Sequence, residues 1–390
     1  MSRPWLSIIG VGEDGPAGLT AASRAALDHA EIVFGARRHL DLLGLAGQEW
    51  PLPFSVQPLL AHRGQRIVVL ASGDPFCYGV GGSLSAHLDP SEWQAFPAPS
   101  TFSLAAARLG WRLEDTLCLG LHAAPLTRLR SLLGQGQRII CLLRDGAAVG
   151  ELASYLTGNG FGASTLHVMQ ALGGPRERCI NLTAEAYDLT DISAPVCVAI
   201  DAQGLGLPCT PGLPDDLFVH DGQITKRAAR ALTLSALAPR AGEVLWDIGT
   251  GSGSIAIEFL LAARGSTVHA LEADPTRAAR ARANADSFGL GHRFHLTEAR
   301  APEGLQDLPR PQVVFVGGGA SQALLTELAR QTNTRLVANA VTLETEMLLA
   351  QWHQTHGGTL LRVELADAAP LGSKRGWQPQ RPLVQWSVTL

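Results

Sequence analysis

The sequence predicts an α/β protein made of two consecutive modules, and three observations lead to this prediction. Short apolar segments that fit strands alternate with segments that fit helices along most of the chain. Several of these strands run directly into glycine-rich loops, as in parallel sheets that bind ligands at the carboxyl ends of their strands. A stretch rich in Gly, Pro and Asp, residues 201–222, separates the two halves.

Composition limits the classes of function. The 390 residues are 46% hydrophobic and 17% charged with a formal net charge of −4, so nothing indicates a nucleic-acid partner or a disordered tail. The N-terminus lacks a signal-peptide pattern and no apolar run has transmembrane length, so we expect a cytoplasmic protein with no membrane partner. Six scattered cysteines without a C-x-x-C pair predict reduced thiols and no metal site.

In the first half, three predicted strand ends lead into loops that suit a ligand. Strands are predicted at 6–11, 32–34 and 67–71, and helices at 20–29 and 103–109. Each loop taken alone is an ordinary turn or helix start, but loops after parallel strands meet at one edge of the sheet. The candidate cofactor-binding residues of this half are therefore Gly10, Gly12, Gly73, Asp74, Pro75, Ser100 and Thr101.

Residues 119–200 are predicted to form a second α/β subdomain. Strands are expected at 138–143, 164–169 and 196–200. A helix is expected at 151–157 and ends at the glycines that follow it.

In the second half, the stretch VLWDIGTGSGSIAIEF at 244–259 predicts a strand, a glycine turn and a helix. The dinucleotide fingerprint needs glycine at 254, where Ser254 stands, which favours an adenosine-bearing ligand other than NAD. Glu272 ends the next strand, 266–271, and suits the two hydroxyls of a ribose; the alternative is a structural turn followed by a surface glutamate. The candidate cofactor-binding residues are Asp247, Gly249, Thr250, Gly251, Gly253, Glu272 and Ala299.

A helix predicted at 224–237 carries cations at its start. Thr225, Lys226 and Arg227 form its head, where positive charge opposes the helix dipole. Either an anionic ligand lies nearby or the helix end is simply solvated. Further strands are predicted at 293–296, 313–316 and 336–341, and a further helix at 277–284.

These motifs resemble two known families. IGVGEDGPAGLT, ASGDPFCYGVG and PAPSTFSLAAARLGW resemble the tetrapyrrole methylases in that family's order, although an insertion departs from its usual G-x-G-P-G loop. ITKRAAR, DIGTGSGSIAIE, FVGGGAS and NAVTLET resemble the decarboxylating precorrin methyltransferases, which have a Rossmann-like S-adenosylmethionine fold. The resemblance implies a two-subdomain tetrapyrrole methylase domain at 1–202, with subdomains of about 1–118 and 119–202. A linker and lead-in at 203–222 and a Rossmann-like domain at 223–390 follow.

The resemblance also implies the chemistry. It implies one S-adenosylmethionine site in each domain. The first domain would methylate precorrin-6B at C5, and the second would methylate C15 and remove carbon dioxide from the C12 acetate. The product would be precorrin-8X of cobalamin biosynthesis. By the same analogy we expect a homo-oligomer. Lys226 and Thr225 are candidate catalytic residues. The implied substrate is a polycarboxylate, so its candidate ligands are basic residues, and the alternative for each is an ordinary surface charge. They are Arg37, Arg38, Arg227, Lys374 and Arg375.

Three alternatives remain open at this point. One is a related methyltransferase that acts on the cobalt-bearing substrate. The second is an RNA or protein methyltransferase, against which the net charge of −4 and the missing Asn-Pro-Pro-Tyr motif count. The third is a nucleotide-binding scaffold without activity.

Overall fold

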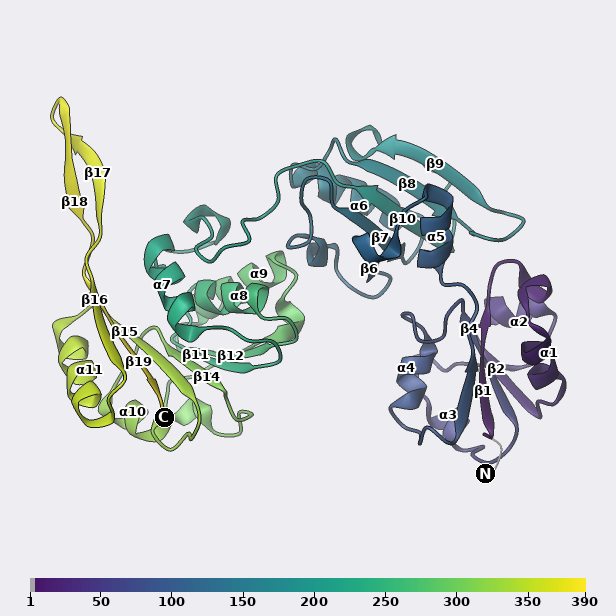
Figure 1. The fold of residues 1–390 in the computed structure, drawn as a ribbon, viewed down its shortest axis with the longest axis horizontal. Coiled ribbons are helices and arrows are strands. Elements are labelled where there is room, and N and C mark those ends of the chain that lie inside the picture. The colour runs from purple at the N-terminus through teal and green to yellow at the C-terminus, as the bar shows by residue number, and fades with distance from the viewer. Residues whose placement is uncertain (1–3) are drawn as a thin grey trace. The chain divides into compact units, whose positions relative to one another are not determined.

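A computed structural model describes residues 4–390 of the chain. The chain forms two compact units: residues up to Leu126 with Leu133–Leu205, and Thr127–Leu132 with Gly206–Leu390. Each unit is an α/β arrangement, as the sequence predicts (Figure 1). Within the part of the chain that the structure describes, no helix has the length and apolar character needed to cross a membrane.

The first unit begins with a parallel sheet of five strands in the order β3-β2-β4-β1-β5. β1 and β4 are apolar and buried because helices cover the sheet and leave no solvent-facing alternation. The strands are β1 (Leu6–Val11), β2 (Ile32–Gly35), β3 (Gln48–Glu49), β4 (Ile67–Ser72) and β5 (Trp93–Phe96). The helices are α1 (Ala21–Asp28), α2 (Arg37–Leu43), α3 (Gln57–Leu60) and α4 (Val80–Ser85).

A second sheet of the same unit has the order β6-β7-β10-β8-β9 and is mixed, with only β6 and β7 parallel. Its strands and helices are β6 (Thr116–Gly120), β7 (Arg138–Leu143), β8 (Thr165–Gln170), β9 (Arg178–Thr183), β10 (Val196–Asp201), α5 (Thr101–Leu109) and α6 (Ala147–Gly158). Phe102 and Ala105 of α5 pack with Ile140 and Ala199 of this sheet. The apolar face of α5 therefore groups it with the second subdomain, whereas the sequence analysis grouped it with the first.

The second unit contains a sheet of seven strands in the order β13-β12-β11-β14-β15-β19-β16. The five strands from β13 to β15 are parallel, and β19 runs antiparallel to both of its neighbours. The strands are β11 (Val244–Ile248), β12 (Thr267–Glu272), β13 (Phe294–Glu298), β14 (Val313–Val316), β15 (Arg335–Ala340), β16 (Thr359–Val363) and β19 (Leu383–Thr389). The helices are α7 (Arg227–Leu237), α8 (Ser254–Ala262), α9 (Pro275–Ser287), α10 (Gln322–Leu328) and α11 (Leu343–His356).

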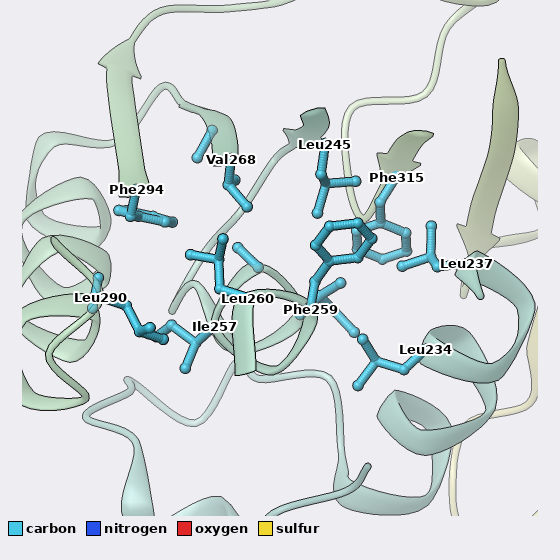
Figure 2. Packing of buried hydrophobic residues seen from close by; sticks show 14 of the residues in the cluster. Leu234, Leu237, Leu245, Ile257, Phe259, Leu260, Val268, Leu290, Phe294 and Phe315 are labelled. Carbon is cyan, nitrogen blue, oxygen red and sulfur yellow. The ribbon is translucent and has the colours of Figure 1, made fainter. Parts of the chain in front are cut away.

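Two cores hold this sheet. On one face, Phe259 of α8 points toward Leu245 and Phe315 of the sheet, and Leu260 points toward Val268 (Figure 2). Leu234 of α7 belongs to the same core. On the other face, α10 and α11 cover a core that includes Trp352 and Trp386. α8 is buried on most of its surface, which fits its largely apolar sequence; Glu258 is its one charged residue.

A two-stranded ribbon, β17 (Ala366–Leu371) with β18 (Lys374–Pro379), extends from the sheet of the second unit (Figure 1). The sequence analysis did not anticipate β16 to β19. The lead-in also differs from a plain linker, because Leu213 and Phe218 belong to the core of the second unit. α7 begins at Arg227, so Thr225 precedes the helix that we expected to include it, and Lys226 is the N-cap.

Short 3-10 turns complete the connections between these elements. They are η1 (Gly15–Gly18), η2 (Leu113–Asp115), η3 (Leu126–Leu129), η4 (Ala184–Ala186), η5 (Asp215–Leu217), η6 (Gly291–Arg293) and η7 (Glu303–Leu305).

Candidate functional site

Three loops of the first unit meet where β1 and β4 end. Gly73 donates its backbone N–H to Val11, and Ala98 donates to the carbonyl of Gly73 at 3.2 Å. A Cβ atom on Gly10 would lie 1.9 Å from that same carbonyl oxygen and 2.6 Å from the nitrogen of Ala98. Only glycine allows this close approach of the backbones. Residue 10 must therefore be glycine for the loops to pack, which the sequence motif alone did not show.

A cavity of about 250 Å³ lies at this meeting point. Five of the seven residues predicted for this half line it: Gly12, Gly73, Asp74, Ser100 and Thr101. Gly10 and Pro75 are not among the lining residues. Ser100 is the N-cap of α5 and accepts from the N–H of Ser103, while Asp74 accepts from the N–H of Phe76 at 2.8 Å. The side chains of Ser100 and Asp74 thus hold the loops that border the cavity in place.

A polar cluster borders the same cavity at the start of α2. Arg38 pairs with Glu13 and donates to Ser72 at 2.8 Å, whereas His39 lies behind it with Nε2 3.0 Å from the Ser72 oxygen. Burial, together with the charge of Arg38, lowers the pKa of His39 to about 4, so the ring is neutral. Arg37 is exposed, pairs with Asp41 and does not line the cavity. Of the two predicted arginines, the structure brings only Arg38 to the site.

Tyr78 was missed by the sequence analysis. Its φ of 56° is unusual for a bulky residue, and its hydroxyl donates to the carbonyl of Cys118 at 2.9 Å. The ring occupies the space above Gly120, where a Cβ would lie 2.4 Å from it, and it borders the cavity. The Gly-Asp-Pro motif three residues earlier was the nearest signal in the sequence.

In the second unit, the glycine turn after β11 has the geometry that its sequence predicts. Gly249, Gly251 and Gly253 have φ values of 72°, 59° and 77°. A Cβ on Gly249 would lie 2.9 Å from the carbonyl oxygen of Gly318, so the loops after β11 and β14 are in close contact. The turn leads into α8, which directs the amide groups of its first turn toward the carboxyl edge of the sheet.

Two carboxyl groups fix this turn. Asp247 is fully buried and accepts from the Thr250 hydroxyl, and its Oδ1 makes no hydrogen bond of ordinary geometry to the described residues. Burial raises the pKa of Asp247 to about 7. Glu272 accepts from the N–H of Gly251 at 2.9 Å and from that of Asp274 at 3.0 Å. Because an ionised carboxylate has about four acceptor positions, Glu272 retains acceptors for hydroxyl groups.

A buried ion pair, also missed from the sequence, holds the start of α7. Arg230 is fully buried, pairs with Glu258 of α8 and donates to the carbonyl of Thr225. The same Glu258 accepts from the N–H groups of Gly212 and Leu213. Breaking such a pair is costly, because removal of one partner leaves a buried charge. Arg230 is therefore held in place, and its hydrogen bond fixes Thr225 and the adjacent Lys226. The Lys226 amine lies 3.8 Å from Asp215 and remains half-exposed.

A cavity of about 1560 Å³ lies at the carboxyl ends of β11, β12, β14 and β15. Most of the predicted residues of this unit line it: Thr225, Lys226, Arg227, Gly249, Thr250, Gly251, Glu272 and Ala299. Four predicted residues do not line the cavity. Asp247 is the penultimate residue of β11, before the turn, and Gly253 is the last residue of the turn, whereas Lys374 and Arg375 are exposed on β18. Arg277, Arg300 and Arg381 also line the cavity and were not predicted. Arg300 directly follows the predicted Ala299, whereas nothing in the sequence marked Arg381.

The comparisons with known proteins cover both units. The first matches the model of the Tetrapyrrole (Corrin/Porphyrin) Methylases over residues 6–188, and the second matches the Precorrin methyltransferase domain over residues 216–390. A precorrin-6Y C(5,15)-methyltransferase (decarboxylating) from a Sinorhizobium species is 45% identical over 399 aligned positions, which cover 99% of this chain and 96% of that protein. The chain belongs to the family of decarboxylating precorrin-6Y C(5,15)-methyltransferases.

Other members of this family show the same full-length match. The protein of that name from Mycobacterium tuberculosis (strain CDC 1551 / Oshkosh) is 38% identical over 98% of this chain and 99% of its own length. Among solved structures, the C-terminal domain of precorrin-6Y C5,15-methyltransferase from Rhodobacter capsulatus is 50% identical. It covers 47% of this chain and 100% of that domain, with a TM-score of 0.46. The predicted family, fold class and enzyme class, a methyltransferase that depends on S-adenosylmethionine, are thus confirmed.

Proposed function

We propose that this chain methylates precorrin-6B at C5 and C15 and removes carbon dioxide from the C12 acetate to give precorrin-8X in cobalamin biosynthesis. The observation that carries the proposal is the match of both units, in one chain, to full-length relatives whose names give C5 and C15 methylation of a precorrin with decarboxylation. The large cavity of the second unit supports it, since a volume of about 1560 Å³ accommodates a cofactor together with a substrate larger than an ordinary metabolite.

The proposal includes two S-adenosylmethionine sites, one in each unit. In the second unit, the left-handed glycine turn and the spare acceptors of Glu272 fit the methionine part and the ribose hydroxyls of this cofactor. In the first unit, the loops around Gly73 and Ser100 would hold it. Calorimetric titration of the full chain is expected to give two bound molecules per chain. One molecule per chain would contradict the two-site proposal.

Methyl transfer requires little general acid–base catalysis from the protein. The cofactor supplies an electrophilic methyl group on a sulfonium, and the meso carbons of the reduced ring are enamine-like nucleophiles. The protein therefore contributes alignment and exclusion of water. For decarboxylation the conjugated imines of the ring accept the electron pair from the broken C–C bond, and the former acetate carbon then takes up a proton from water to become a methyl group. The residues around the cavity orient the substrate for this step.

Three further points belong to the proposal. The substrate is the metal-free ring, the enzyme works in the cytoplasm, and it is a homo-oligomer. The decisive experiment is mass spectrometry of the product after incubation with precorrin-6B and S-adenosylmethionine. A gain of two methyl groups with loss of one carbon dioxide is expected. If only the cobalt complex reacts, the substrate assignment moves to that complex, and if neither reacts, the proposed function is wrong.

The proposal divides the reaction between the units: the first methylates C5, and the second methylates C15 and removes carbon dioxide. Lys226 provides a test of this division. Its amine borders the cavity of the second unit, beside Asp215. Lys226→Ala is expected to slow methylation at C15 more than at C5, roughly tenfold, because a charged contact to a substrate carboxylate is lost. Lys374→Ala, which changes an exposed lysine of β18, is the matched control. An equal loss at both carbons would refute the assignment.

A further inference from the structure

Three arginines converge on the large cavity of the second unit from separate segments of the chain. Arg227 begins α7, Arg300 follows β13, and Arg381 lies between β18 and β19. All three are exposed. Among residues 4–390, no acidic side chain forms an ion pair with any of them.

Another arginine of the same cavity behaves differently. Arg277 lies 3.2 Å from Asp221 and donates to Gln223 at 2.6 Å, so its charge is already balanced by the protein. Arg277 thus forms an ion pair within the protein, whereas Arg227, Arg300 and Arg381 form none with the described residues. In the part of the chain that the structure describes, the cavity lining has five basic side chains, and its three carboxylates, Asp215, Glu272 and Asp367, form no ion pair with these three arginines. The excess of positive charge favours an anionic ligand.

We propose that Arg300 and Arg381, together with Arg227, form the subsite that recognises the acidic side chains of the substrate in the second unit. This inference rests on the proposed function, because it takes a polycarboxylate tetrapyrrole as the ligand. A guanidinium binds a carboxylate through two parallel N–H donors, which lysine cannot do. Three such groups from three segments fix the orientation of a large flat ring as well as its charge.

The chemistry of carbon dioxide loss restricts which carboxylates these arginines hold. An arginine on the departing C12 carboxylate would stabilise the reactant more than the transition state and so raise the barrier. The three arginines therefore bind acidic side chains that remain in the product. Loss of an arginine should weaken substrate binding and leave the coupling between C15 methylation and decarboxylation unchanged.

The test uses Arg300→Ala and Arg381→Ala in the full-length chain. Each is expected to raise KM for the precorrin in the C15 reaction roughly tenfold, with kcat within about twofold, and to leave the affinity for S-adenosylmethionine unchanged. One carbon dioxide should still be lost for each methyl group added at C15. Arg300→Lys should recover only part of the affinity, since the charge stays and the paired donors are lost.

Arg264→Ala is the matched control. Arg264 is also exposed and unpaired in the described part of the chain, but it lies between α8 and β12, at the opposite edge of the sheet. It should have wild-type KM. An unchanged KM in both cavity variants, or a fall in kcat alone, would overturn the inference and leave the proposed function intact.

A binding experiment separates failure of the inference from failure of the proposed function. Uroporphyrin, a stable polycarboxylate tetrapyrrole, is titrated by fluorescence into the full-length chain with S-adenosylhomocysteine present. If the wild type lacks activity but binds uroporphyrin, and both variants bind it more weakly, the subsite stands and the reaction assignment fails. If the variants bind uroporphyrin as the wild type does, or the wild type does not bind it, the subsite is refuted.

Discussion

At or next to each of the two cavities, a glycine at or after a strand end is required, but for a different reason of backbone geometry. In the first unit, Gly10 has ordinary strand geometry and is needed because two other loops approach its α-carbon. In the second unit, Gly249 is needed both for its φ of 72° and for its closeness to Gly318. A glycine after a strand can therefore mark either a crossing of loops or a left-handed turn, and the sequence motif alone does not distinguish the two.

The cavities also differ in charge. In the first, about 250 Å³, Arg38 is paired with Glu13, whereas the second, about 1560 Å³, contains Arg300 and Arg381 without acidic partners among the described residues. Next to each cavity, outside its lining, lies a group whose charged form is disfavoured by burial: His39 in the first unit and Asp247 in the second. The first site is thus more nearly balanced by the protein itself, and the second relies more on its ligand for charge balance.

Gly10→Ala is expected to have the largest effect. The new Cβ would overlap backbone atoms of two loops that no side-chain movement can relieve, at a cost of about 3 kcal/mol or more. Methylation at C5 should be lost, while C15 methylation and decarboxylation remain on the same chain. Product analysis by mass spectrometry and NMR measures both.

The control for this change is Gly82→Ala, in α4, where an added Cβ meets no atom within 4 Å. It should retain C5 methylation. If Gly10→Ala also kept that activity, the crossing of loops would not matter for the first site.

Gly249→Ala is expected to have the next largest effect, restricted to the second unit. The left-handed backbone and the 2.9 Å approach to Gly318 together should cost about 1–3 kcal/mol and remove one of the two cofactor sites. Gly265→Ala separates the two causes, because its φ is also 72° but its added Cβ would meet no atom closer than 3.9 Å. Calorimetric stoichiometry should fall to one for Gly249→Ala and stay at two for Gly265→Ala; equal values would contradict this account.

The smallest expected effect is on the pH dependence of stability, and its sign differs between the units. The pKa of Asp247 is raised to about 7, so its contribution to the free energy of unfolding is present at low pH and is lost as the pH rises from about 4 to 7. The pKa of His39 is lowered to about 4, so its contribution is present above its ordinary pKa and is lost as the pH falls toward 4.

Thermal unfolding between pH 4 and 8 measures both contributions. Asp247→Asn should remove the decline above pH 4, and His39→Gln should remove the decline below pH 6.5. Thr250→Val, which removes the hydroxyl donor to Asp247, should raise the pKa of that carboxyl further and extend the decline to higher pH. A variant with the same pH profile as the wild type would show that the corresponding group is not buried as described.

Much of the fold could be predicted from local sequence. Apolar runs such as 67–71 and 313–316 became buried parallel strands, because a strand covered on both faces must be apolar throughout. The turn from Gly249 to Gly253 was likewise predictable, since its glycines need positive φ and the helix follows at once. The exposed strands β16 to β18 gave no comparable signal, because little of their surface is buried and their apolar residues do not alternate with polar ones.

The sequence by itself determined the two sets of loops that follow the strands, their order and the family, because these depend on local backbone geometry and on motifs of adjacent residues. Only the tertiary structure decided which charges reach a cavity. Lys374 and Arg375 lie on the exposed ribbon, while Arg381, a few residues later, returns to the cavity where the chain enters β19. Burial of Arg230 against Glu258 was also hidden, since the two are 28 residues apart and meet only when α7 packs on α8. Charge placement depends on long-range packing, and that is the part of this site that local sequence does not encode.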